Sequence, residues 1–185
     1  MGKISGLSSV NQRTVERLSR EKKVSIDRIT GLVNSIRTEF YDEHPDATGM
    51  DWSYGTTTIN GSTPPGRLLP LQNTVEVVDK IVGGQHVSVM LGTRKAGTRV
   101  GIHVHESGGT TFVVGGKGRI TDFVEGFPNS FNPVGSYYYM PSNIPMSAAN
   151  LSKRDVRLMD VFITPVGEAA ITIIEPGYPG YNPPA

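Results

Sequence analysis

Two histidines, His103 and His105, are separated by one residue in a segment of β-forming residues. Side chains two positions apart on a strand project from the same face, so the two imidazoles can reach one common point. Imidazole nitrogen is a frequent ligand of divalent metal ions, and neutral imidazole also acts as a general base. The spacing therefore predicts a shared metal ion or an acid–base pair, with two ordinary strand histidines as the alternative.

The chain contains no cysteine, so disulfides, thiolate nucleophiles and sulfur-rich zinc sites are excluded. A third metal ligand is then expected to be a carboxylate or another histidine. Glu106 follows the pair directly, while His86 and Asp160 lie in neighbouring predicted strands. Glu106 would complete a two-histidine, one-carboxylate site only if the strand ends there, because strand alternation otherwise points it to the opposite side.

Aromatic and methionine side chains of the same region could complete a site around the histidines. Tyr137 and Tyr139 share one face of a predicted strand and are candidate proton donors, with core or interface packing as the alternative. The residues expected to bind a substrate are Met90, Thr110, Phe112, Met140 and Met146. A largely apolar pocket with a few polar groups is the usual construction of a small-molecule site.

Composition limits the classes of protein that this chain can belong to. It has 185 residues, of which 37% are hydrophobic and 19% charged, so one folded domain is expected. The net charge is +1, which gives no reason to expect nucleic acid or an anionic membrane as partner. No apolar run approaches the roughly 20 residues of a membrane span. We expect a soluble protein, with the cytoplasm favoured and export after removal of a leader left open.

The larger part of the chain is rich in short β-forming runs. They cover residues 75–82, 86–91, 98–104, 111–114, 119–124, 136–140, 157–164 and 169–174. Glycine- and proline-containing turns separate them at spacings of roughly 8 to 15 residues, which is typical of an antiparallel sandwich or barrel. We therefore assign 73–175 to a β domain, 1–44 to a helical extension, 45–72 to a loop-rich linker packed on that domain, and 176–185 to an extended surface tail.

Two helices are expected in the extension. The first would begin after Ser9 and carry Val15 and Leu18. The second would begin after Ser25, and its apolar residues are Ile29, Leu32, Val33, Ile36 and Phe40. Their spacing places them on one face of a helix. This face is expected to pack on the main domain or on a partner subunit.

Two ordered motifs lie in the β-rich part of the chain. In the first, Gly97 is followed after five residues by His103-Val-His105, and then by a strand that ends in a glycine turn at 115–118. The second consists of Gly135, a proline at position 141 and Asn150. Together they resemble the two signatures of the cupin family, and the resemblance covers roughly residues 73–175. It implies an all-β, cupin-like jelly-roll barrel with an N-terminal helical extension and a site in the mouth of the barrel.

The sequence departs from the cupin pattern at two of the four usual metal ligands. Gly109 and Thr110 stand where the family has an acidic ligand, and Met146 stands at the position of the third histidine. A thioether is a poor ligand for the hard or borderline ions that imidazole and carboxylate hold. Only the two imidazoles of the first motif therefore remain as expected ligands.

Two classes of function are compatible with these residues. One is a cupin-type small-molecule enzyme with oxygenase, isomerase or lyase chemistry, in which His103 and His105 hold a divalent ion such as Fe, Mn, Ni or Zn. The other is a metal-free cupin that uses acid–base chemistry, binds a small ligand, or acts as a regulatory protein. The resemblance also implies a homodimer. Fold does not determine substrate, and no phosphate or nucleotide motif is present.

Overall fold

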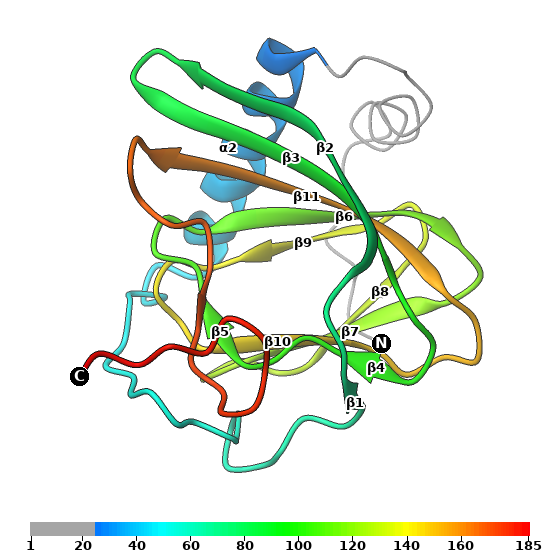
Figure 1. Ribbon diagram of the computed structural model, residues 1–185. Coiled ribbons are helices and arrows are strands. Elements are labelled where there is room, and N and C mark those ends of the chain that lie inside the picture. Colours follow the sequence, from blue (N-terminus) through cyan, green and yellow to red (C-terminus); the bar gives the residue numbers. More distant parts are fainter. Residues whose placement is uncertain (1–24) are drawn as a thin grey trace.

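Two β-sheets face each other in the structure, a computed structural model that describes residues 25–185 (Figure 1). The strands are β1 (Arg67–Leu68), β2 (Gln72–Val82), β3 (Gln85–Arg94), β4 (Thr98–Arg99), β5 (His103–Val104), β6 (Gly109–Gly116), β7 (Arg119–Val124), β8 (Ser130–Pro133), β9 (Tyr137–Met140), β10 (Met146–Asn150), β11 (Val156–Pro165) and β12 (Thr172–Ile173). One sheet has five strands in the order β2-β3-β11-β6-β9. The other has seven strands, and its β10 pairs with β4, β5 and β7.

Neighbours in each sheet come from distant parts of the chain. The long strand β11 pairs antiparallel with both β3 and β6, and β12 pairs with β5. These pairings close the two sheets around a common interior. The fold is the predicted all-β, cupin-like jelly-roll barrel with an N-terminal helix.

All eight predicted runs contain strand residues, although 98–104 is divided between β4 and β5. The sequence did not predict β1, β8 or β10. The strand β10 carries serine and two alanines at its centre, and these residues have little β propensity. Pairing with strands on both sides holds β10 in place despite this composition.

The predicted second helix is present as α2 (Ile26–Glu43). Its buried side chains are Ile29, Leu32, Val33 and Ile36, which are four of the five expected apolar residues. Ser25 occupies the N-cap position, but its side chain makes no capping hydrogen bond. The predicted first helix, with Ser9, Val15 and Leu18, lies outside the described residues. No helix within 25–185 has the length and apolar character needed to cross a membrane.

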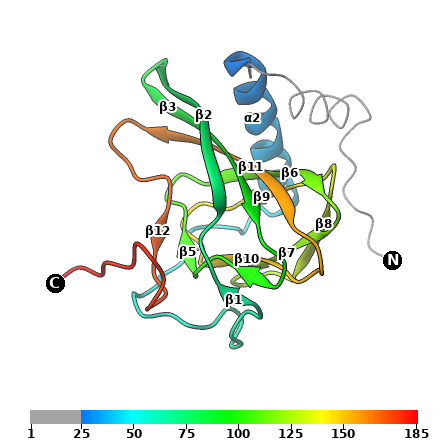
Figure 2. The same ribbon diagram turned by 45° about the vertical axis from the view of Figure 1, so that its right-hand side comes forward.

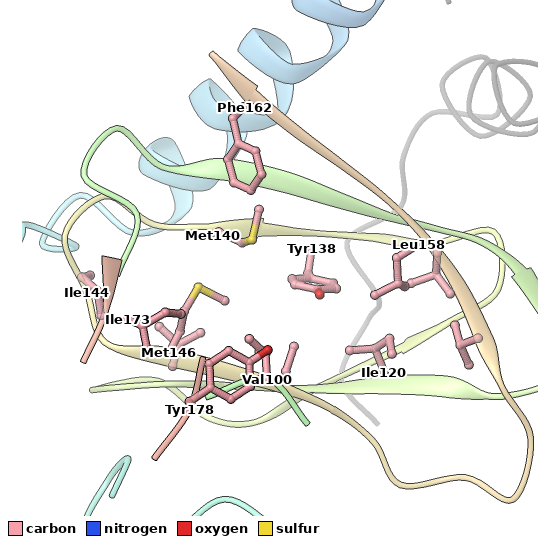
Figure 3. Close-up of a cluster of buried hydrophobic side chains, with 14 residues drawn as sticks. Val100, Ile120, Tyr138, Met140, Ile144, Met146, Leu158, Phe162, Ile173 and Tyr178 are labelled. Carbon is pink, nitrogen blue, oxygen red and sulfur yellow. The ribbon is translucent and has the colours of Figure 1, made fainter. Parts of the chain in front are cut away.

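The buried apolar side chains form three clusters that correspond to the layers of the molecule. The interior cluster, between the sheets, consists of Val100, Val113, Ile120, Val124, Tyr138, Met140, Ile144, Met146, Ala148, Val156, Leu158, Phe162, Ile173 and Tyr178 (Figure 3). The helix-side cluster consists of Ile29, Leu32, Val33, Ile36, Val78, Val87, Val89, Phe112, Tyr139, Met159 and Val161. Its residues come from α2 and from the five-stranded sheet, which lie next to each other in Figure 2. The loop-side cluster, outside the seven-stranded sheet, consists of Ile59, Ile102, Val104, Phe123, Ala149 and Ile174.

The barrel extends beyond the predicted boundaries 73–175 at both ends. Strand β1, assigned to the linker by the sequence, pairs with β4 in the seven-stranded sheet. Tyr178, assigned to the surface tail, is 7% exposed and belongs to the interior cluster. Its ring packs against Gly101, where a Cβ atom would lie 2.5 Å from the Tyr178 Cγ. The absence of a side chain at Gly101 therefore allows the C-terminal segment to close the barrel.

Candidate functional site

The histidine pair lies on β5, in the seven-stranded sheet. His103 is the cross-strand partner of Met146 on β10 and of Ile173 on β12, and both of these belong to the interior cluster. Val104, one residue further, belongs to the loop-side cluster on the opposite face. Because side chains alternate along a strand, the imidazole of His103 points into the barrel, and so does that of His105.

Both imidazoles are almost completely removed from solvent. His103 is 3% exposed and His105 is 1% exposed. Phe162 reaches across from the five-stranded sheet and stacks on His105, with 5.0 Å between the ring centroids. Gly109 leaves room for this ring, since a Cβ atom there would lie 2.7 Å from the Phe162 Cδ1. The histidines are thus held between the two sheets.

Each imidazole is oriented by a backbone carbonyl. Nδ1 of His103 donates a hydrogen bond to the Gly101 carbonyl oxygen at 2.7 Å. Nδ1 of His105 donates to the Ala170 carbonyl oxygen at 2.6 Å. A carbonyl oxygen can only accept, so the proton of each neutral imidazole lies on Nδ1. The Nε2 atoms then both carry a lone pair, and they face each other at 3.1 Å.

This arrangement leaves two acceptors in contact without a donor between them. Loss of solvation, and to a smaller extent the neighbouring His105, lowers the pKa of His103 to about 3. Loss of solvation likewise lowers the pKa of His105 to about 4. Both rings are therefore neutral at physiological pH, which is the form that binds metal ions. Groups with pKa values this far below neutrality are weak general bases.

The turn that follows β9 supports the histidine strand. The backbone N–H of Asn143 donates to the His105 carbonyl oxygen at 2.8 Å. Asn143 has a φ of 55°, and its side-chain oxygen accepts a hydrogen bond from Trp52 Nε1 at 2.7 Å. Asparagine tolerates this left-handed conformation better than most residues. Trp52, the single tryptophan, thus anchors the loop between α2 and β1 against the turn that holds His105.

Glu106 does not face the imidazoles. Its Oε1 accepts a hydrogen bond from the Thr172 hydroxyl. Thr172 is the cross-strand partner of Val104, whose side chain lies on the outer face of the sheet. Strand alternation therefore continues through Glu106 and turns its carboxylate away from the interior.

The other two proposed ligands make contacts with other residues. His86 lies on the β2–β3 hairpin, where its Nε2 is 2.5 Å from the Asp79 carboxylate. Asp160 lies on β11 and accepts a hydrogen bond from the Thr111 hydroxyl at 2.7 Å. Within residues 25–185, no three His, Cys, Asp or Glu side chains are grouped so that they could hold a metal ion. The structure thus brings together the two histidines alone among the predicted ligands.

Tyr137 and Tyr139 lie on the other side of the five-stranded sheet from the histidine pair. The Tyr137 hydroxyl donates to the Glu39 carboxylate of α2 at 3.2 Å. Tyr139 belongs to the helix-side cluster and packs on the Phe40 ring. The expectation that these tyrosines donate protons at the histidine pair is therefore not met. It is Tyr138, between them in the sequence, that faces the interior.

The predicted substrate-binding residues are divided between the two faces of the same sheet. Phe112 belongs to the helix-side cluster, and Thr110 is the cross-strand partner of Tyr139 on that side. These two residues cannot line a site inside the barrel. Met140 and Met146 belong to the interior cluster, where Figure 3 shows their sulfur atoms between the two sheets. Met90 pairs with Asp160 on the inner face of the sheet.

Sequence reasoning missed a buried carboxyl group in the interior. Asp122 lies on β7 between Ile120 and Val124, which both point inward. It is 4% exposed, and its Oδ1 has no hydrogen-bond partner. Loss of solvation raises the pKa of Asp122 well above its ordinary value. An aspartate that alternates with two apolar residues on one strand face is a signal that could have been found in the sequence.

No protein-family model and no curated protein matches the chain. A cupin-like protein from Thermotoga maritima is similar in structure, with 17% identity over 68% of this chain and 89% of that chain and a TM-score of 0.46. A conserved protein with a double-stranded β-helix domain from Klebsiella pneumoniae has 18% identity over 69% of this chain and 99% of that one, with a TM-score of 0.44.

A chain from crystal structures of DMSP lyases has 21% identity over 47% of this chain and a TM-score of 0.40. The present chain spans 43% of the length of that chain. These similarities concern the fold alone. The strand order and the buried histidine pair define this protein as a cupin-like barrel with two inward-facing imidazoles.

Proposed function

We propose that this protein is a metal-dependent enzyme in which His103 and His105 hold a divalent ion inside the barrel, where a small-molecule substrate binds. The observation that carries the proposal is the 3.1 Å contact between the two Nε2 atoms. Two lone pairs that face each other in a dry interior repel, and a cation between them removes this repulsion. Fe, Mn, Ni and Zn are the candidate ions; imidazole suits Fe, Ni and Zn, whereas Mn favours oxygen ligands.

The two histidines fit such an ion. Two imidazole nitrogens bound to one ion at about 2.0–2.1 Å, at octahedral to tetrahedral angles, lie about 2.8–3.4 Å apart. The observed separation falls within this range. Metal-binding histidines also donate their other ring N–H to a carbonyl or carboxylate, which fixes the ring. Gly101 and Ala170 supply such carbonyls here.

A bound ion would act as a Lewis acid on an oxygen atom of the substrate. The residues around the pair have separate tasks. Phe162, stacked on His105, excludes water from one side of the site. Asp122 places a carboxyl group inside the barrel, and burial raises its pKa, which favours the protonated form. Because the cross-strand partners of His103 belong to the apolar interior cluster, we expect the substrate to be small.

Metal analysis tests this proposal. The wild-type protein and the His103→Ala/His105→Ala variant are loaded with each divalent ion, desalted and measured by elemental analysis. We expect about one equivalent in the wild-type protein and none in the double variant. His86→Ala is the matched control, because His86 lies on the exposed hairpin, and it should retain the metal. A wild-type protein without metal, or a double variant with as much metal as the wild type, overturns the proposal.

A second candidate function is acid–base chemistry without a metal. The observation that favours it is the group of buried acids in the interior, since burial raises the pKa of both Asp122 and Asp160. The Tyr138 ring lies in the same interior, and its own pKa is raised by burial and by these two carboxyls. This function requires that Asp122→Asn abolishes ligand conversion while removal of metal by a chelator has no effect.

The expected homodimer remains a proposal, and β2 is the element that would form it. This strand is an edge of the five-stranded sheet and exposes Val75 (57%) and Ile81 (65%). A long apolar edge strand can pair with a second copy of itself. Light scattering should give the mass of a dimer for the wild type and of a monomer for Val75→Lys/Ile81→Lys. Leu151→Lys, at an exposed position outside β2, is the control and should stay dimeric.

A further inference from the structure

We infer that the preferred ion of this site is monovalent copper, with the thioether sulfur of Met146 as the third protein ligand beside His103 and His105. This inference rests on the proposed binding of a metal ion by the histidine pair, and it puts Cu(I) in place of the divalent ions considered for that pair above. It goes further by naming the third donor and the chemical class of the ion. Met146 stands at the position of the third histidine of the cupin pattern.

Met146 is placed where a third ligand is needed. It is the direct cross-strand partner of His103, and both side chains point to the same face of the sheet. Directly opposed residues on antiparallel strands have Cβ atoms about 4.5–5.5 Å apart. Met146 is completely buried, and Figure 3 shows its sulfur inside the barrel. A flexible methionine at this distance can bring its sulfur to the ion that the imidazoles hold.

The set of donors is soft and uncharged. It consists of two neutral imidazoles and one thioether, and Glu106, the nearest carboxylate in sequence, lies on the outer face of the sheet. Thioether sulfur favours Cu(I), whereas Mg, Ca and Mn favour oxygen ligands. A methionine in place of the usual histidine therefore favours copper over the ions expected of a three-histidine site.

Burial of the site also favours a single positive charge. The imidazoles are 3% and 1% exposed, and no carboxylate of the described residues joins them in a metal-binding group. The cost of transferring an ion from water to a medium of low dielectric constant rises with the square of its charge. Without a negative ligand, a divalent ion keeps its full charge in this interior. A monovalent ion bears a much smaller cost.

Met140 provides a matched control. It lies on β9 in the opposite sheet, is 4% exposed and belongs to the same interior cluster as Met146. Its sulfur lies 3.5 Å from the Thr111 hydroxyl oxygen. Replacement of Met140 by leucine thus removes a buried thioether of the same size without removing the proposed ligand.

The experiment measures Cu(I) and Zn(II) affinities of the full chain by competition with colorimetric chelators, with oxygen excluded and a reductant present. We expect Met146→Leu to lose more than about tenfold in Cu(I) affinity, as loss of a supporting contact alone costs 10–100-fold in other sites. Its Zn(II) affinity should be unchanged. Met140→Leu should bind both ions as the wild type does, and Met146→His should gain affinity for Zn(II).

X-ray absorption of the wild-type protein loaded with Cu(I) provides a second measurement that does not depend on the folding of any variant. We expect one sulfur and two imidazole nitrogens around copper. An environment without sulfur, or a Met146→Leu variant with wild-type Cu(I) affinity, overturns the copper inference but leaves the histidine site intact. Cu(I) and Zn(II) binding that are both unaffected by His103→Ala/His105→Ala overturns the proposed function itself.

Discussion

Two pairs of buried polar side chains in this barrel differ in how their facing atoms match. In the complete pair, Arg99 and Glu175, donors face acceptors, whereas in the incomplete pair, His103 and His105, two acceptors face each other. Arg99 and Glu175 form a bidentate ion pair, with Nη1–Oε2 at 2.5 Å and Nη2–Oε1 at 2.6 Å. Both side chains are about 4% to 5% exposed. The backbone N–H of Ile102 donates a further hydrogen bond to Glu175 at 2.7 Å. Opposite charges and this donor satisfy the carboxylate within the chain.

His103 and His105 are buried to the same extent but do not satisfy each other. Their Nδ1 atoms have acceptors, while their Nε2 atoms face each other as two lone pairs. The difference between the pairs shows that burial alone does not identify a functional site. A structural pair is completed by the chain, whereas we propose that the histidine pair is completed by an ion that the chain does not provide.

The largest effect is expected from breaking the complete pair. Glu175→Ala should lower the free energy of unfolding by about 3–5 kcal/mol, because it leaves the Arg99 guanidinium buried without its counter-charge. The double variant Arg99→Met/Glu175→Leu should recover most of this loss, since apolar residues replace both charges. Denaturant unfolding measures both effects. A Glu175→Ala protein as stable as the wild type would show that the ion pair is not needed to close the barrel.

The incomplete pair should become stabilising only when an ion is added. An ion at 100 times its dissociation constant raises the free energy of unfolding by about 2.7 kcal/mol, because it binds the folded chain alone. This gain should vanish in His103→Ala/His105→Ala and persist in Glu106→Gln, whose side chain lies on the outer face. Thermal unfolding with and without metal checks it. An equal gain in the double variant would place the ion elsewhere.

An intermediate effect that depends on pH is expected at Asp122. In the unfolded chain this carboxyl has its ordinary pKa of 3.8, whereas burial raises the pKa in the folded chain well above that value. The folded state therefore binds more protons than the unfolded state above about pH 4, and stability falls as pH rises. Asp122→Asn removes the ionisable group and therefore this fall in stability with pH.

The Asp122→Asn variant should thus gain stability relative to the wild type between about pH 4 and pH 7, as measured by unfolding at each pH. Asp155→Asn is the control. This exposed carboxylate accepts a hydrogen bond from Lys95, which lowers its pKa, so its replacement should not produce such a gain. Parallel pH profiles of the wild type and Asp122→Asn would show that the buried carboxyl is ionised and has found a partner.

The smallest effect is expected at the Thr110 hydroxyl, which belongs to neither pair. The Thr110 hydroxyl is buried on the helix side of the five-stranded sheet and has no hydrogen-bond partner. Thr110→Val should therefore raise the free energy of unfolding by about 1 kcal/mol, because it replaces an unsatisfied hydroxyl with a methyl group of the same shape. Urea unfolding measures this change. A loss of stability instead would show that the unpartnered hydroxyl at this position is not costly.

Several features of the site follow from residue types and local spacing. The period of two along a strand is enough to put His103 and His105 on one face, and it also turns Glu106 away. The 3.6-residue period of a helix likewise predicts α2 and its buried residues. These properties depend on the backbone geometry of a single element, and the sequence contains that information.

Which face of each strand is inside depends on the packing of the whole chain. Alternation separates Tyr138 from Tyr137 and Tyr139, but only the position of α2 decides that Tyr138 is the residue in the interior. The strand β10, weak in β propensity, forms because it has partners on both sides. Tertiary context overrides local preference in both cases.

The histidine pair illustrates the same division. The sequence by itself determined that two imidazoles would lie side by side on an all-β framework. Only the tertiary structure decided that their Nε2 atoms meet at 3.1 Å and that Met146 stands beside them. The reason is that the groups that orient the pair, such as the Ala170 carbonyl 65 residues from His105, are brought to it by folding of the barrel.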